Sequence, residues 1–204
     1  MSIKDLQLKF LIRFNPKSCN NVALKMALNG SMQHNKLYKD QLNENKKEEI
    51  RVYWISELET FAIKYKNTQQ IEVFKEDILL LKKKINNSFS DNFNQEEDPK
   101  DFNNGFKLSH AQKSLSVYLK HLWCMGKIGI PPFPPIDRSI LAKAGFKNQY
   151  PSWTKVNDIE QFDVHLKCLM TAAKSTHISE WELSQFEELQ KNNNFNIILL
   201  GKKT

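Results

Sequence analysis

Glycine, cysteine and long apolar runs are scarce in this sequence. Six glycines in 204 residues argue against a glycine-rich nucleotide-binding loop and against a turn-dense β-sandwich. Three cysteines, Cys19, Cys124 and Cys168, stand far apart without a C-x-x-C pair, so neither a zinc site nor a disulfide framework is indicated. No stretch approaches the roughly 18 apolar residues of a membrane span, and the charged N-terminus has no secretory signal. We therefore expect a soluble, cytoplasmic monomer that uses no membrane, metal or cofactor.

Acidic side chains are almost missing from one stretch, Phe102 to Val156, in which Asp137 is the single carboxylate. The eight cations around it are Lys107, Lys113, Lys120, Lys127, Arg138, Lys143, Lys147 and Lys155. The chain has 30 Lys and Arg against 23 Asp and Glu, so 22 of each remain outside the stretch, which carries the whole net charge of +7. A basic surface of this kind suits a polyanion, usually a nucleic acid. The isolated Asp137 is a candidate reagent, although helix capping would also explain it.

Apolar residues recur at three- and four-residue spacing along most of the chain, which predicts an all-α protein. We expect one domain of two helical lobes: a first lobe over residues 1–86, a polar connection over 87–106, a basic segment over 107–156 and C-terminal helices over 157–204. The expected helices run from about Lys46 to Lys66, from Gln69 to Asn86, from Ser109 to Gly126, from Asp137 to Gly145, from Asn157 or Asp158 to Lys174, and from Ser179 onwards, with a weaker one between Val22 and Leu42 broken near Gly30. The tail from Phe195 to Leu200 suits a short strand or a helical end.

Two S-x-x-[QE] patterns, at Ser109 and at Ser179, predict capping boxes that open the third and the last long helix. Between the third helix and Asp137 the chain reads Pro131-Pro132-Phe133-Pro134-Pro135. Proline lacks a backbone donor and restricts its neighbours, so this segment must cross in an extended form. Asp137 then opens the next helix.

Lys113 lies in the first turns of the helix that Ser109 opens, about 160° around the helix from Leu115. The positive end of the helix dipole and the nearby cations favour its neutral amine, which is the nucleophilic form of lysine. Asp137, 24 residues later, could stabilise a developing cation and accept a proton. The alternative for Lys113 is an ordinary solvated helix lysine.

SHAQKSLSVYL followed by PPIDRSILAKAG, within Leu108 to Gly145, resembles the helix-hairpin-helix DNA glycosylase superfamily. The resemblance implies that Lys113 is the Schiff-base lysine and Asp137 the catalytic aspartate of an enzyme that flips a base out of duplex DNA and cleaves its N-glycosidic bond. The hairpin glycines of the family are absent here, and no C-terminal cysteine cluster indicates its iron–sulfur branch. The interval between Lys113 and Asp137 is nearest to that of the archaeal 8-oxoguanine glycosylases.

The resemblance also implies residues for binding double-stranded DNA and for holding the flipped base. The expected phosphate contacts are Lys107, Ser109, His110, Arg138, Lys143 and Lys147, and the expected base-pocket aromatics are Trp123, Phe133 and Trp153. The tryptophans also suit ordinary core packing. Repair of oxidised guanine and removal of a modified base from phage DNA are both open. The competing hypothesis is an all-α nucleic-acid-binding module without chemistry.

Overall fold

The structure, a computed structural model, describes residues 1–33, 37–94, 105–146 and 152–200, with the backbone alone over residues 192–200. The helices are α1 (Ile3–Phe14), α2 (Asn20–Met32), α3 (Glu44–Ala62), α4 (Ile71–Phe89), α5 (Leu108–Cys124), α6 (Arg138–Lys143), α7 (Ile159–Ala173) and α8 (Ile178–Leu200). Two short 3₁₀ turns, η1 (Ile63–Lys66) and η2 (Ser90–Asn92), follow α3 and α4. The remaining pairing within these ranges is one isolated bridge between Tyr38 and Phe93. The all-α prediction is confirmed.

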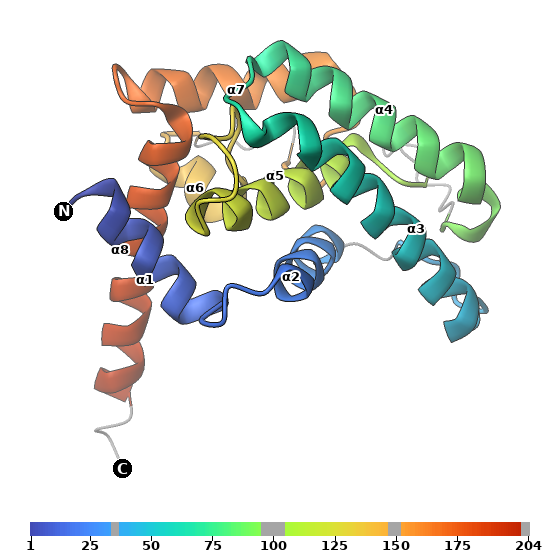
Figure 1. The fold of residues 1–204 in the computed structure, drawn as a ribbon, viewed down its shortest axis with the longest axis horizontal. Helices are drawn as coiled ribbons and strands as arrows, with labels where there is room; N and C mark the ends of the chain where they lie inside the picture. The colour runs from blue at the N-terminus through green and yellow to red at the C-terminus, as the bar shows by residue number, and fades with distance from the viewer. Residues whose placement is uncertain (34–36, 95–104, 147–151, 201–204) are drawn as a thin grey trace.

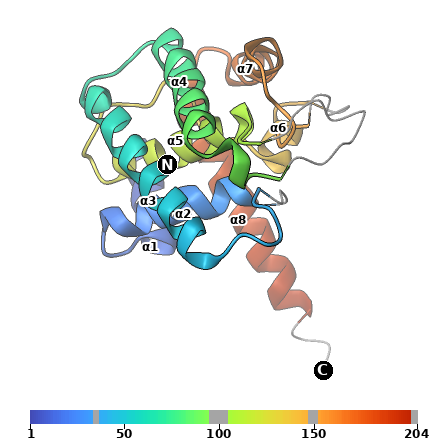
Figure 2. The ribbon, with the colours of Figure 1, turned by 90° about the vertical axis from the view of Figure 1, so that its right-hand side faces the viewer.

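Helix α5 is the centre of the molecule, with α2, α3 and α4 packed along it and α1 across its C-terminal half (Figures 1 and 2). All but one of its 17 residues are buried, polar ones included. A helix that is covered on every side buries whatever it carries. The side chains of α5 are therefore set in place by elements that come from distant parts of the chain.

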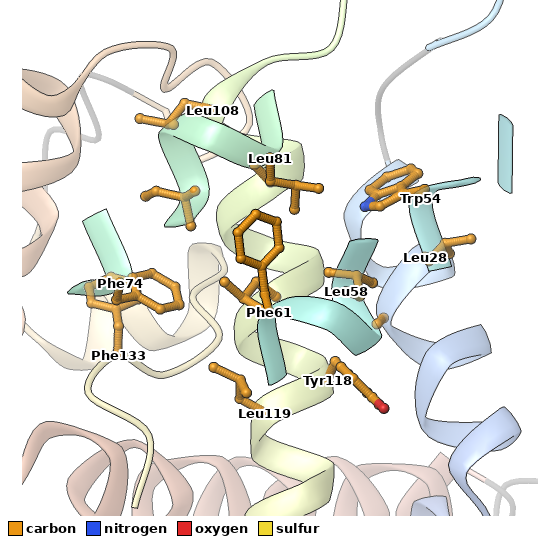
Figure 3. Packing of buried hydrophobic residues seen from close by; sticks show 14 of the residues in the cluster. Leu28, Trp54, Leu58, Phe61, Phe74, Leu81, Leu108, Tyr118, Leu119 and Phe133 are labelled. Atoms are coloured by element: carbon orange, nitrogen blue, oxygen red, sulfur yellow. The ribbon is translucent and has the colours of Figure 1, made fainter. Parts of the chain in front are cut away.

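One large apolar cluster joins residues from both expected lobes, from Ala23 in α2 to Leu169 in α7. Leu58 and Phe61 lie towards Tyr118 and Leu119 of α5 in this cluster, and Leu81 lies beside Phe61 (Figure 3). A second, smaller cluster joins Leu6 and Phe10 of α1 to Trp123 and Leu183. No helix within the described residues is both long and apolar enough to cross a membrane.

Helix α1 is present in the structure but is not among the helices that we expected from the sequence. It begins with a capping box in which the Ser2 hydroxyl accepts from the Asp5 N–H at 3.2 Å and the Asp5 carboxylate accepts from the Ser2 N–H at 3.0 Å. Its inner face is formed by Leu6 and Phe10, and it packs against α5 and α8. The Ser2-x-x-Asp5 pattern and the four-residue spacing of Leu6, Phe10 and Phe14 are visible in the sequence, so α1 was predictable.

Both serine capping boxes expected from the sequence are wrong. Helix α5 begins at Leu108, and the Ser109 hydroxyl donates to the Thr154 carbonyl at 3.1 Å instead of capping. Helix α8 begins at Ile178, and the Ser179 hydroxyl donates to the Pro131 carbonyl at 2.6 Å. In both places a tertiary hydrogen bond takes the hydroxyl that a local cap would use.

The expected polar connection over residues 87–106 is described only at its two ends. Phe93 and Phe106 are both fully buried. Asn86 binds the backbone of Phe106 twice, as a donor to its carbonyl at 2.8 Å and as an acceptor from its N–H at 3.1 Å. The two ends are therefore fixed side by side at the start of α5. Residues 95–104 lie outside the described residues.

Candidate functional site

Lys113 is buried, with 7% of its surface exposed, and is not the solvated helix lysine of the alternative interpretation. Its Nζ donates to the Ile136 carbonyl at 2.7 Å. The ring of Trp153 lies on another side, 5.2 Å from Nζ to the ring centroid. The extended proline segment brings Ile136 to this place, and the hydrogen bonds of Ser109 to Thr154 and Val156 fix the segment that carries Trp153. The turn of α5 that carries Lys113 therefore lies between the segment with Ile136 and the segment with Trp153.

Burial lowers the pKa of Lys113 below its usual value, because the ammonium loses its hydration. The carboxylates of Asp137 and Glu182 oppose this shift, and the Lys120 ammonium adds to it. The net direction is downwards, so a larger fraction of Lys113 is the neutral amine than in a solvated lysine. A neutral amine is what a nucleophilic lysine requires.

Asp137 caps α6, as the sequence predicts. Its Oδ1 accepts from the Ile140 N–H at 2.9 Å, and its backbone is extended. Pro131 to Pro135 and Ile136, which lead to it, are all buried. The capping role does not exclude a chemical one, because Asp137 also lines the same cavity as Lys113.

That cavity has a volume of about 170 Å³ and lies between α1, α2, α5, α8 and the start of α6. Its polar lining consists of Lys113, Lys120, His121, Asp137 and Glu182, together with Gln33. The apolar lining consists of Phe10, Phe14, Met26, Gly30, Val117, Pro135 and Phe186. Gln33 is exposed and Phe14, Met26 and Phe186 are half-buried, whereas Lys113, Lys120 and Glu182 are buried. The charged groups therefore form the floor, and the aromatic rings form much of the wall.

A second charged pair occupies the floor of this cavity. Lys120 Nζ donates to both carboxylate oxygens of Glu182, at 2.9 and 2.8 Å, and both side chains are almost fully buried. The same ammonium lies over the rings of Phe186 and Phe10, at 4.1 and 4.8 Å from their centroids. His121 packs against Phe10, and burial lowers its pKa to about 4, so its imidazole is neutral at pH 7.

The expected phosphate contacts differ in their exposure to solvent. Arg138 and Lys143 are exposed, and Lys143 forms an ion pair with Glu188 at 3.2 Å. Lys107 is half-buried, and Lys147 lies outside the described residues. Two further cations of the basic stretch, Lys113 and Lys120, are inside the protein.

Ser109 and His110 are buried and so cannot be the phosphate contacts that the sequence suggested. The imidazole Nδ1 of His110 accepts from the Lys107 N–H at 2.9 Å, which closes the first turn of α5. Burial lowers the pKa of His110 to about 3, and the nearby Lys107 adds to this shift. A neutral, enclosed imidazole has no charge to offer a phosphate.

Trp123 and Phe133, expected in the base pocket, do not line the cavity. Trp123 belongs to the small cluster with Leu6 and Leu183. Phe133 lies beside Phe74 in the main core (Figure 3), and its ring also contacts that of Phe162. Trp153 is close to the site through its contact with Lys113 but does not form the cavity wall.

We expect Phe133→Leu to change stability and not function. Phe133 is fully buried, and its ring centroid lies 5.4 Å from that of Phe74 and 4.5 Å from that of Phe162. Loss of the ring should lower the free energy of unfolding by about 1–2 kcal/mol, measured by urea denaturation. Binding to duplex DNA should stay at the wild-type level. Weaker binding at unchanged stability would place Phe133 in the site after all.

Several residues of the site were missed by sequence reasoning. Phe10 and Phe14 come from the unexpected α1, and Glu182 was assigned to a capping box. Lys120 was counted only as a surface cation, although it lies seven residues, about two helical turns, after Lys113 and therefore on the same face. That spacing was the one signal in the sequence for a second lysine in the site.

No group of His, Cys, Asp and Glu side chains within the described part of the chain is arranged to hold a metal ion. The chain matches no protein-family model, no curated protein and no solved structure. The resemblance to the glycosylases stays a prediction that rests on the residues from Leu108 to Gly145.

Proposed function

We propose that this protein is a DNA glycosylase in which Lys113 is the nucleophile and Asp137 the catalytic carboxylate. The observation that supports this most strongly is the shared cavity: a buried lysine with a lowered pKa and a carboxylate at a helix start meet in one small pocket with aromatic walls. Buried titratable groups with shifted pKa values in a pocket are typical of catalytic sites.

The size of the cavity suits a single ring system. An apolar cavity of about 150 Å³ holds a benzene ring, and the cavity here has a volume of about 170 Å³. Phe10, Phe14 and Phe186 could stack on a planar ligand. Enzymes that act on a base in duplex DNA bring it out of the stack into a pocket of this kind.

The proposed chemistry needs only the side chains of the pocket. The neutral Lys113 amine attacks C1′ of the flipped nucleotide, a C–N bond forms, and the glycosidic bond breaks with its electron pair leaving on the base. Asp137 stabilises the positive charge that develops on the sugar and accepts the proton that the amine loses. The C1′–O4′ bond then breaks, its electron pair stays on O4′, and the remaining proton of the Lys113 nitrogen moves to O4′. The resulting imine between Lys113 and C1′ permits elimination of the 3′-phosphate, which cleaves the strand.

Duplex binding should depend on salt and on Arg138. Arg138 is exposed and follows Asp137 directly, and we expect it to contact a phosphate near the cavity. Each phosphate contact that is lost should reduce the slope of log K against log salt by about 0.9. We expect Arg138→Ala to flatten the slope more than Lys143→Ala, because Glu188 already pairs with Lys143. The matched control is Lys83→Ala, an exposed lysine on α4. An affinity that is independent of salt would argue against a nucleic-acid partner.

The function is tested by incubating the protein with a panel of duplexes that carry oxidised guanine or other modified bases. Base release, measured by chromatography, and a covalent complex after borohydride reduction support the proposal. Tight, salt-dependent binding without base release on any duplex would favour the alternative, a nucleic-acid-binding module without chemistry.

A further inference from the structure

The proposed reaction uses Lys113 and Asp137 and leaves a second ion pair, Lys120 with Glu182, without a role. Both side chains are almost fully buried, with 4% and 2% of their surfaces exposed. A buried ion pair loses its hydration and gives little net stability compared with apolar side chains of similar volume. Its presence on the floor of the same cavity calls for another explanation.

The pair lies where it acts on Lys113. Lys120 is two turns from Lys113 on α5, and Glu182 reaches the cavity from α8. The two members act on Lys113 in opposite directions, since the Lys120 cation disfavours the Lys113 ammonium and the Glu182 carboxylate favours it.

Other charged and titratable groups also lie around the cavity. Asp137 is the second carboxylate that acts on Lys113. The His121 imidazole is neutral, and α2 with its C-cap residue Gln33 contributes only the uncharged Met26, Gly30 and Gln33 to the lining. On α1, Arg13 is paired with Glu187 of α8 at 3.3 Å.

We propose that Lys120 and Glu182 are a pair of positioning residues that sets the charge of the Lys113 amine, Lys120 favouring the neutral form and Glu182 the ammonium. Paired, they act on Lys113 in opposite directions, together with burial, which favours the amine, and Asp137, which favours the ammonium. The charge coupling stands without the proposed function, and only its use in catalysis rests on that function.

The coupling predicts opposite effects from the two halves of one ion pair. Lys120→Met leaves the Glu182 carboxylate alone beside Lys113 and should move the titration midpoint of Lys113 to higher pH by about one pH unit. Glu182→Gln leaves the Lys120 cation alone and should move it to lower pH by a similar amount. The double variant Lys120→Met/Glu182→Gln should return close to the wild-type midpoint. A pair that only supports the fold would not give shifts of opposite sign.

The midpoint is read from the ¹³Cε resonance of Lys113 in lysine-labelled protein, without DNA, and assigned by its disappearance in Lys113→Gln. The matched control is Lys143→Met/Glu188→Gln, which removes an exposed ion pair at 3.2 Å and should leave the midpoint unchanged. Should one single variant fail to fold, the other still gives a shift of defined sign, which is compared with the neutral double variant. Lys120→Arg and Glu182→Asp keep both charges and serve as controls that should titrate like the wild type.

Shifts in the same direction, no shift, or a double variant far from the wild type would each overturn the proposal. If the two single variants shift the midpoint in opposite directions but no base is released, the charge coupling is supported and the proposed glycosylase function is wrong. If base is released, the rate should increase with pH, because the reactive amine is the deprotonated form. The pH at which the rate increases should be higher in Lys120→Met and lower in Glu182→Gln than in the wild type.

Discussion

Lys113→Gln is expected to reduce borohydride trapping on substrate DNA to background. An imine can form only from a primary amine, and Lys113 lines the cavity together with Asp137 and has its pKa lowered by burial. Glutamine removes the amine but keeps a polar group that can donate a hydrogen bond in place of the one to the Ile136 carbonyl, so we expect the local fold to persist. The measurement is the fraction of radiolabelled DNA that stays attached to protein after denaturing electrophoresis.

The matched control for this variant is Lys82→Gln. Lys82 Nζ also donates to a backbone carbonyl, that of Asn157 at 2.8 Å, and burial lowers the pKa of Lys82 as well. It does not line the cavity, so the trapped fraction should stay at the wild-type level. If Lys113→Gln is trapped as well as the wild type, Lys113 is not the nucleophile. A wild-type protein that releases base but is never trapped uses water in place of the amine.

Asp137→Asn is expected to lower the rate of base release by about 10²-fold or more. The substitution removes the negative charge that stabilises the developing sugar cation and keeps nearly the same volume. Asparagine is also a good N-cap residue, so the bond to the Ile140 N–H at 2.9 Å can be kept and α6 should stay folded. Binding to DNA should be retained or improved, since a negative charge near phosphates is lost. Single-turnover kinetics measure the rate.

Asp158→Asn is the matched control for the aspartate. Asp158 caps α7 in the same way, with its Oδ1 accepting from the Gln161 N–H at 2.7 Å, and it does not line the cavity. Base release should therefore be unchanged in this variant. Asp137→Ala separates the two roles of Asp137, because it should add a loss of about 1 kcal/mol in stability from the missing cap. Wild-type rates in both Asp137 variants would restrict Asp137 to capping.

Local patterns were enough to predict most helices and the position of Asp137. The apolar spacing around Trp54 predicted α3, and the proline segment predicted an extended crossing that ends at the N-cap Asp137. These features depend on residues within a few positions of each other, where steric and hydrogen-bonding rules are strong. The 3.6-residue period alone indicates the existence of a helix, but not what covers its polar face.

The cavity could not be predicted in the same way, because its walls come from opposite ends of the chain. Lys120 was expected on the surface since lysine is rarely buried without a partner, and its partner Glu182 is 62 residues away. The prediction for Ser109 failed for the same reason. Its hydroxyl donates to the carbonyl of Thr154, 45 residues later, and does not cap the helix. Long-range pairs of this kind have no periodic signal.

The pairing of α1 with α8 has a consequence for synthesis of the protein. Arg13 and Glu187, which join the two helices, are 174 residues apart. At translation rates of roughly 5–20 residues per second, α1 waits about 10 to 35 s before α8 is made. During that time Leu6 and Phe10 lack Leu183, their partner on α8 in the small cluster. Helix α1 is therefore a segment that a chaperone could hold on the ribosome, and the cavity can be complete only after α8 has left the ribosome.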